Sequence, residues 1–259
     1  GPGVVTGASD DDPSGILTYL QTGTVLGLKS LWFVLITLPM MYIVQEMCGR
    51  IGFVTEKGLI KIIKSHYSKY ILFAVASVSV FVITINIGAD LLAIGVIFEK
   101  IFGFNRLILI PLTSVLIILL LVLFSYQKIV KVLKWLTLSL FFYVITVFFI
   151  KIDWLTVLKS TFTPSISLSK NGIMLMAAVF GTTISPYLFF WQASEEVEER
   201  ESRKNEKSLK RLIVTKNELK TLKKDTFMGM LFSNGIMWFI IVGASQLGII
   251  YGVKEIINF

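Results

Sequence analysis

The sequence has almost none of the residues that usually form disulfides, zinc sites or nucleophilic centres. Of its 259 residues, one is a cysteine, Cys48, and one is a histidine, His66. A lone cysteine can form no disulfide within the chain, and no cluster of Cys or His offers a zinc site. His66 stands in a polar stretch, which favours a solvated ring. Since no nucleophile and base are paired either, the sequence predicts a protein that is not an enzyme and needs no cofactor.

Charged residues are also scarce. They make up 16% of the chain, against 54% hydrophobic residues, whereas soluble domains have about 25% charged residues. An interrupted apolar segment occupies residues 3–27. Six further apolar runs are each long enough to span a bilayer as a helix, and they occupy residues 28–49, 71–98, 107–126, 130–150, 172–193 and 226–251. The sequence therefore predicts an all-α integral membrane protein in contact with the lipid bilayer.

Acidic residues are fewer than basic ones, and the net charge is +8. Most of the 25 Lys and Arg residues lie in alternate loops between the apolar segments, on the side that holds the N-terminus. Under the positive-inside rule, this asymmetry predicts a cytoplasmic N-terminus. Membrane topology thus explains the basic charge, and nucleic acid is not an expected partner.

The interruption of the first segment is the first candidate site. Residues 9–15, Ser-Asp-Asp-Asp-Pro-Ser-Gly, break the apolar run. An acid at bilayer depth costs at least about 2.5–3.5 kcal/mol, so it usually faces a protein interior or a wet cavity. Pro13 removes a helical donor and Gly15 tolerates unusual backbone angles, which favours an unwound point with free carbonyl oxygens. The alternative is a soluble loop before the first span, in which an Asp caps a helix.

The sixth segment, 172–193, is interrupted in a similar way. Between Gly181 and Pro186 it contains Thr182 and Ser185, which would offer hydroxyl and carbonyl oxygens to a cation. The alternative is a proline-kinked helix whose hydroxyls bond back to their own backbone. Two interruptions five spans apart are typical of transporters with inverted repeats, which bind their substrate at the repeat interface. We therefore predict that the two unwound points meet around a cation.

Three other polar features stand out. Asp90 is a second acid within a span, and it is either functional or interfacial. The stretch 195–225 is strongly charged, with opposite charges at helical spacing, and is predicted to be a cytoplasmic linker with helical character. The last span carries small and polar residues suited to close helix packing.

The first 58 residues contain a series of short motifs. They are Gly1-Pro2-Gly3, Asp12-Pro13, Leu20-Gln21-Thr22-Gly23, Leu31-Trp32, Gln45, Arg50-Ile51-Gly52 and Val54-Thr55. In their order and spacing these motifs resemble the Nramp family of divalent-metal transporters. In that family the first helix carries Asp-Pro-Gly-Asn and the sixth carries Met-Pro-His-Asn, and these motifs bind manganese or iron. The resemblance implies a leucine-transporter-type inverted-repeat bundle with broken helices 1 and 6, of which helices 1 to 7 are present here.

The sequence departs from the family pattern at the metal site. The family's Asn position is Gly15, and its Met position is Ser185. The His position is Tyr187, and the position that supplies a carbonyl is Thr182. Thioethers favour transition metals, whereas carboxylate, hydroxyl and carbonyl oxygens suit magnesium. Magnesium also retains several waters, for which smaller residues leave room.

This combination resembles the Nramp-related magnesium transporters. The resemblance implies a site for the transported metal that is formed by Asp12, the Ser185 hydroxyl, the Thr182 carbonyl, the space at Gly15, and Asp11 as a contact or an attracting charge. The metal would be a substrate and not a cofactor.

Proton coupling is not expected. Coupled family members carry an acidic pair on the third helix, in a pattern like Asp-Leu-Ala-Glu-Val-Ile-Gly. Residues 90–95 read Asp-Leu-Leu-Ala-Ile-Gly and contain one acid. The resemblance therefore implies uncoupled, alternating-access transport of Mg²⁺, and also of Mn²⁺. Two alternatives stay open, a proton-coupled Mn²⁺ or Fe²⁺ importer and a cation-binding membrane assembly or sensor protein that transports nothing.

We expect residues 1–259 to form a single transmembrane transporter domain. Its first repeat would occupy residues 3–150, helices 6 and 7 of the second repeat residues 172–251, and helices 8 to 10 would lie outside this sequence. The expected location is a bacterial plasma membrane.

Overall fold

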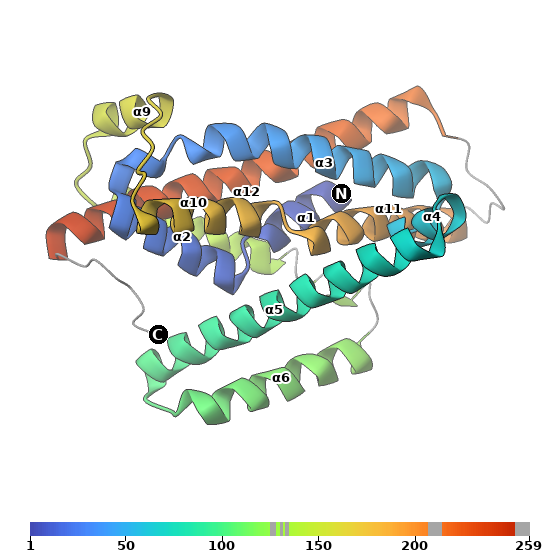
Figure 1. The fold of residues 1–259 in the computed structure, drawn as a ribbon, viewed down its shortest axis with the longest axis horizontal. Helices are drawn as coiled ribbons and strands as arrows, with labels where there is room; N and C mark the ends of the chain where they lie inside the picture. The colour runs from blue at the N-terminus through green and yellow to red at the C-terminus, as the bar shows by residue number, and fades with distance from the viewer. Residues whose placement is uncertain (125–127, 130–131, 133–134, 207–213, 252–259) are drawn as a thin grey trace. The chain divides into compact units, whose positions relative to one another are not determined.

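Helices make up most of the part of the chain that the structure describes. The computed structural model describes residues 1–124, 128–129, 132, 135–206 and 214–251, and these contain helices and turns but no strand. Figure 1 shows the helices along the chain. Their bounds are α1 Pro2–Asp10, α2 Pro13–Leu26, η1 Gly27–Ser30, α3 Phe33–Thr55, α4 Leu59–His66, α5 Lys69–Phe102, α6 Arg106–Leu123, η2 Thr137–Leu140, α8 Phe141–Phe148, α9 Trp154–Phe162, α10 Lys170–Thr183, α11 Pro186–Glu206 and α12 Lys216–Tyr251.

Within the described residues, five helical segments are long and apolar enough to cross a membrane. They are Phe33–Thr55, Lys69–Phe102, Arg106–Leu123, Lys170–Lys204 and Lys216–Ile249. The predicted first segment is divided into two short helices, α1 and α2, as its interruption indicated. The predicted span at 130–150 includes residues outside the described part, and its described remainder contains η2 and α8.

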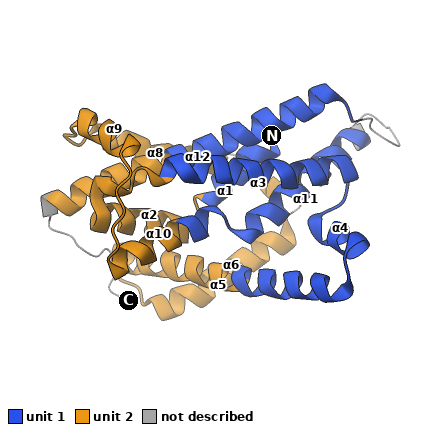
Figure 2. Ribbon diagram, turned by 45° about the horizontal axis from the view of Figure 1, so that its top comes forward, with its two compact units in different colours: residues 1–10, 34–83, 180–235 blue, residues 11–33, 84–179, 236–259 orange. Residues whose placement is uncertain are grey.

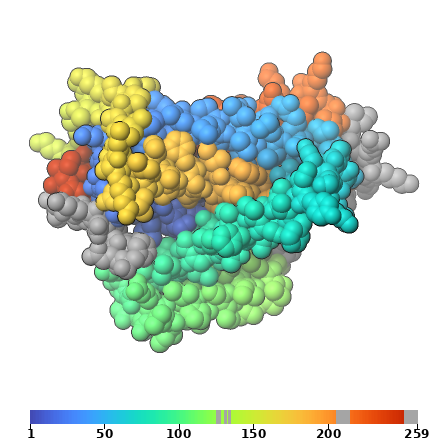
Figure 3. Space-filling view, in the orientation of Figure 1, coloured from blue at the N-terminus to red at the C-terminus, as the bar shows by residue number. Residues whose placement is uncertain are grey.

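The surface of α6 suits contact with lipid. The helix is almost entirely apolar, and Leu107, Val122 and Leu123 leave 74%, 75% and 72% of their surface exposed. Figure 3 draws α6 in green, with its side chains on the face in view. In water such a face would be costly, but in hydrocarbon it costs nothing, while the backbone polar groups are satisfied within the helix.

The start of α3 differs from the prediction, which began this span at residue 28. Gly27 has a φ of +62° and its N–H donates to the carbonyl of Gly23, which ends α2. A single 3-10 turn, η1, follows, and α3 begins only at Phe33. A glycine is needed at this point because other residues rarely adopt a positive φ.

The charged stretch that follows the sixth span is helical at both of its described ends. The apolar run was predicted to end at 193, yet α11 continues to Glu206, because Glu, Lys and Arg are good helix formers and Glu199 pairs with Arg203 one turn on. Glu196 and Arg200 are buried here, so this part of the charged stretch packs within unit 1. Residues 207–213 of the predicted linker lie outside the described part.

The chain divides into two compact units, which Figure 2 shows in blue and orange. Unit 1 contains residues 1–10, 34–83 and 180–235, and unit 2 contains residues 11–33, 84–179 and 236–259. Several long helices, α3, α5, α10 and α12, contribute residues to both units.

In unit 1, α1 crosses α12 with almost no space between the backbones. A Cβ atom added to Gly7 would lie 2.2 Å from the carbonyl oxygen of Gly229. A Cβ atom added to Gly229 would lie 1.9 Å from the carbonyl oxygen of Gly3. These glycines therefore permit the contact. The core beside it contains Met41, Leu188 and Met230.

In unit 2, α2 and the end of α12 pack together in the same manner. A Cβ on Gly23 would lie 2.6 Å from both the Ala244 Cβ and the Ile241 carbonyl oxygen. The indole of Trp32 donates to the carbonyl of Ser165 at 3.1 Å, which holds the segment before α10 against the start of α3.

Candidate metal site

The first helix break lies between Asp10, where α1 ends, and Pro13, where α2 begins. Asp12 is the N-cap of α2, with an extended backbone at φ −73° and ψ 167°. Its Oδ1 accepts hydrogen bonds from the Gly15 backbone N–H at 2.6 Å and from the Ser14 hydroxyl at 3.0 Å. The break exists because Pro13 has no N–H to donate and is preorganised for the first turn of a helix.

A second helix of unit 2 supports this break. Asn86 of α5 donates from Nδ2 to Oδ2 of Asp12 at 3.1 Å. Asp90, one turn further along α5, accepts the Ser14 N–H at 3.0 Å. Both oxygens of Asp12 are therefore fixed in direction, one by its own helix and the other by α5.

The other two acids of the run are buried in different units. Asp10 has no exposed surface in unit 1, and the Ser233 hydroxyl of α12 donates to its Oδ2 at 2.5 Å. Asp11 is buried in unit 2, where its carboxylate acts electrostatically on Tyr143 of α8. Three consecutive carboxylates therefore have three separate surroundings.

The second break lies between Thr183, the end of α10, and Pro186, the start of α11. Ser185 stands between them, and its hydroxyl donates to the carbonyl oxygens of Gly181 and Thr182, both at 2.8 Å. The Ser185 side chain thus satisfies carbonyls that the end of α10 would otherwise leave unpaired. The Thr182 hydroxyl is buried and has no partner among the described residues.

These hydrogen bonds match the alternatives that the sequence left open, since Asp12 does cap a helix and Ser185 does bond back to its backbone. Neither bond removes the capacity to bind a cation. A carboxylate has about four lone-pair sites, and a hydroxyl that donates its proton keeps its two lone pairs. A serine bonded in this way has its lone pairs directed away from the helix end.

The candidate residues fall into two sets. Asp11, Asp12 and Gly15 belong to unit 2, whereas Thr182 and Ser185 belong to unit 1. Their convergence around one ion stays a prediction. Across the described residues, no group of three or more His, Cys, Asp or Glu side chains is placed to hold a metal. A site that includes Asp12 must therefore draw further donors from hydroxyl, carbonyl or amide oxygens, or from water.

Sequence reasoning missed Asn86 and Ser233. Asn86 stands four residues before Asp90, on the same helical face, so a polar pair facing inward was available as a signal. Ser233 gave no signal, because its role depends on the crossing of α1 and α12.

Tyr187, which replaces the family's histidine, packs against the apolar cluster of unit 1.

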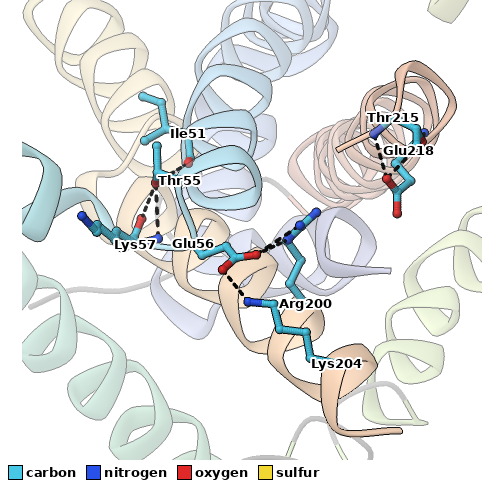
Figure 4. Close-up of polar contacts among 8 residues, drawn as sticks. All are labelled: Ile51, Thr55, Glu56, Lys57, Arg200, Lys204, Thr215 and Glu218. Atoms are coloured by element: carbon cyan, nitrogen blue, oxygen red, sulfur yellow. Dashed lines mark hydrogen bonds and ion pairs between the residues drawn. The ribbon is translucent and has the colours of Figure 1, made fainter. Parts of the chain in front are cut away.

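A separate ion-pair cluster in unit 1 connects the turn between α3 and α4 to α11 (Figure 4). Glu56, between α3 and α4, accepts hydrogen bonds from Arg200 and Lys204 of α11. The Arg200 guanidinium lies 4.5 Å from the centre of the Phe53 ring. The hydrogen bond from Lys204, followed by that from Arg200, lowers the pKa of Glu56 below its ordinary value.

An all-helical bundle with membrane-length apolar helices and two helices broken at proline defines an integral membrane protein of the leucine-transporter type. Residues 3–256 match the family described as natural resistance-associated macrophage protein-like, or Nramp. The chain belongs to the Nramp family.

Similar curated proteins carry the names of metal transporters. The chain is 25% identical over 217 residues to the divalent metal cation transporter MntH of Levilactobacillus brevis, which covers 82% of the chain and 47% of that protein. It is 26% identical over 222 residues to the metal transporter NRAT1 of rice, Oryza sativa subsp. japonica, covering 81% of the chain and 39% of that protein. The chain thus spans about half or less of the length of these relatives.

Solved structures agree on the fold. The crystal structure of the Eremococcus coleocola manganese transporter, in complex with an aromatic bis-isothiourea substituted compound, matches with a TM-score of 0.75 at 16% sequence identity. The match covers 96% of this chain and 50% of that one.

Proposed function

We propose that this chain belongs to a membrane transporter for divalent metal ions, which carries Mg²⁺ and also Mn²⁺ by uncoupled alternating access. The observation that carries the proposal is Asp12, a carboxylate at a helix break that two helices hold in a fixed direction. Membership of the Nramp family and the transporter names of the relatives support the coarser part of the proposal, the transport of divalent metal ions. Both relatives are named as transporters, and neither is named as an enzyme.

The proposed ion site uses hard oxygen donors. Asp12 is the charged anchor, Ser185 supplies a hydroxyl, and the carbonyl of Thr182 completes this side. Gly15 leaves space for water on the ion, and Asp11 attracts or contacts it. Without a thioether the donors favour Mg²⁺ over softer metals, and Mg²⁺ readily keeps part of its water shell.

The membrane potential is a sufficient driving force for uncoupled transport. A divalent cation gains about 4.6 kcal/mol for each 100 mV when it moves inward, twice the value for a single charge. A thousandfold accumulation costs about 4.1 kcal/mol, so the membrane potential is enough without a proton.

Transport into liposomes that contain a magnesium-sensitive dye tests the proposal. Asp12→Ala should abolish Mg²⁺ flux, and Ser185→Met should shift the preference from Mg²⁺ towards Mn²⁺. Flux at the wild-type rate after replacement of both Asp11 and Asp12 would overturn the proposed site.

A proton-coupled Mn²⁺ or Fe²⁺ importer is the second candidate. Asp90 favours it, because this membrane-embedded acid contacts the backbone beside Asp12. Simultaneous recording of metal and pH inside the liposomes separates the two, since coupled transport acidifies the lumen together with metal uptake and uncoupled transport does not.

A further inference from the structure

The start of α11 contains a buried polar group that the proposed central site does not use. Gln192 has no exposed surface, and Glu196, one turn further along, is buried with it. The Gln192 amide donates from Nε2 to Oε1 of Glu196 at 3.0 Å. A buried amide and carboxylate at this position are costly unless something else satisfies them.

The amide oxygen of Gln192 is available to a ligand. It has no hydrogen-bond partner among the described residues. Because it shares a carbon with the nitrogen that bonds to Glu196, it lies beside that carboxylate. The Gln192 side chain packs directly against Gly49 of α3, where an added Cβ would lie 3.1 Å from the Gln192 Nε2 and 3.3 Å from its Cγ.

A second carboxylate approaches from α12. The side chain of Asp225 is 18% exposed and acts electrostatically on Glu196. Its Oδ2 accepts the Gly3 N–H of α1 at 2.7 Å, and its Oδ1 lies 3.0 Å from the Gly1 nitrogen. Because α1 also packs against α11, three helices of unit 1 bring this group of residues together.

Asp225 pairs with the Gly1 amine, whereas Glu196 forms no ion pair among the described residues. Glu199 and Arg203, further along α11, pair with each other at 3.2 Å. Arg200 and Lys204 pair with Glu56. Two neighbouring carboxylates and a free amide oxygen are hard oxygen donors, and a divalent cation beside them would relieve their repulsion.

We propose that Gln192, Glu196 and Asp225 form a second divalent-cation site, through which the ion passes on the side of the membrane where α11 carries its charged residues. The inference rests on the proposed transport function. The site binds the ion with two carboxylates and one amide oxygen, and water supplies the remaining ligands of Mg²⁺ or Mn²⁺.

Counting bound Mn²⁺ by electron paramagnetic resonance on the purified protein tests the site. The wild type should bind two ions, and both Asp12→Ala and Glu196→Gln should bind one. The double variant should bind none. Glu199→Gln is the matched control, since it removes an equally charged residue of the same helix that is paired with Arg203, and it should still bind two ions.

Gln192→Leu provides a second variant that keeps all the carboxylates. It should weaken the site that remains in the Asp12→Ala background by at least tenfold, and thermal unfolding of each variant verifies that it is folded. If Glu196→Gln and Gln192→Leu both leave the count and affinity of the wild type unchanged, the second site does not exist, and a proton shared by the two carboxylates is the remaining explanation. If Asp12→Ala alone leaves the count unchanged while Glu196→Gln lowers it, the central site fails and the second site stands.

Discussion

At the scale of single residues, the geometry of Asp12 depends on a partner that follows it by 74 residues. Asn86 donates to Oδ2 of Asp12, whereas Ser14 and Gly15 of α2 donate to Oδ1. A carboxylate held from two sides loses little conformational entropy when it binds an ion. Asn86 is therefore a positioning residue for the proposed central site.

Replacing Asn86 by Ala should weaken Mn²⁺ binding at the central site by about 5- to 10-fold, which corresponds to the net value of one typical intramolecular hydrogen bond. The measurement is a Mn²⁺ titration in the Glu196→Gln background, where the central site alone is counted. Asn105→Ala is the control, because Asn105 also belongs to unit 2 but caps α6. An equal loss in both variants would contradict the positioning role.

Glu56 is a second residue whose role can be tested. Its φ of +55° is the one positive value among the described non-glycine residues, so its backbone is strained. The ion pairs with Arg200 and Lys204 offset this strain and connect the turn after α3 to α11.

Glu56→Gln should lower the free energy of unfolding by about 1–3 kcal/mol at pH 7, because it removes the carboxylate charge that accepts hydrogen bonds from Arg200 and Lys204. The folded-state pKa of Glu56 lies below the ordinary value of 4.5. Its stabilising effect is therefore complete above about pH 4.5 and is lost as the pH falls through the lowered folded-state pKa. Thermal unfolding in detergent between pH 3 and pH 7 should show the two proteins converging in acid. A constant difference over this range would contradict the assignment.

At the scale of helices, glycine determines how closely α1 and α12 approach. Position 229 has no room for a side chain, since a Cβ atom added to Gly229 would lie 1.9 Å from the Gly3 carbonyl oxygen. The same crossing brings Ser233 to Asp10 and Asp225 to Gly3. A change in the crossing would therefore disturb the surroundings of both Asp10 and Asp225.

Gly229→Ala should destabilise unit 1 by about 1–3 kcal/mol, because the backbones must separate to admit the methyl group. Gly235→Ala lies on the same helix, and an added Cβ there meets no atom within 4 Å. It should be neutral or stabilising by up to about 1 kcal/mol, since alanine favours a helix. Thermal unfolding of both variants provides the comparison, and equal effects would show that the crossing is not tight.

At the scale of the whole molecule, the sequence predicted features that depend on local chemistry. Pro13 and Pro186 predicted both breaks, because a missing N–H ends a helix wherever it occurs. The apolar runs predicted the membrane class. The family resemblance is confirmed by the match over residues 3–256, which includes parts of both units.

Features that depend on tertiary packing could not be predicted. The apolar run ends at residue 193, but α11 continues to Glu206. This extension was missed because a change in hydropathy does not end a helix when the following residues are good helix formers. The partners of Asp12 and Asp10 come from α5 and α12, at separations that no local pattern encodes. The burial of Glu196 was missed for the same reason, since charge in the sequence indicated exposure.

In the proposed central site, the Asp12 carboxylate and the Ser185 hydroxyl bind the same divalent cation. An anomalous difference map from crystals of the protein that have been soaked in Mn²⁺ would locate that ion. If both residues bind it, the map contains a peak at bonding distance, about 2–2.5 Å, from an oxygen of each residue, and this peak is lost in Asp12→Ala. A peak that contacts neither residue, or that persists in Asp12→Ala, would contradict the proposed site.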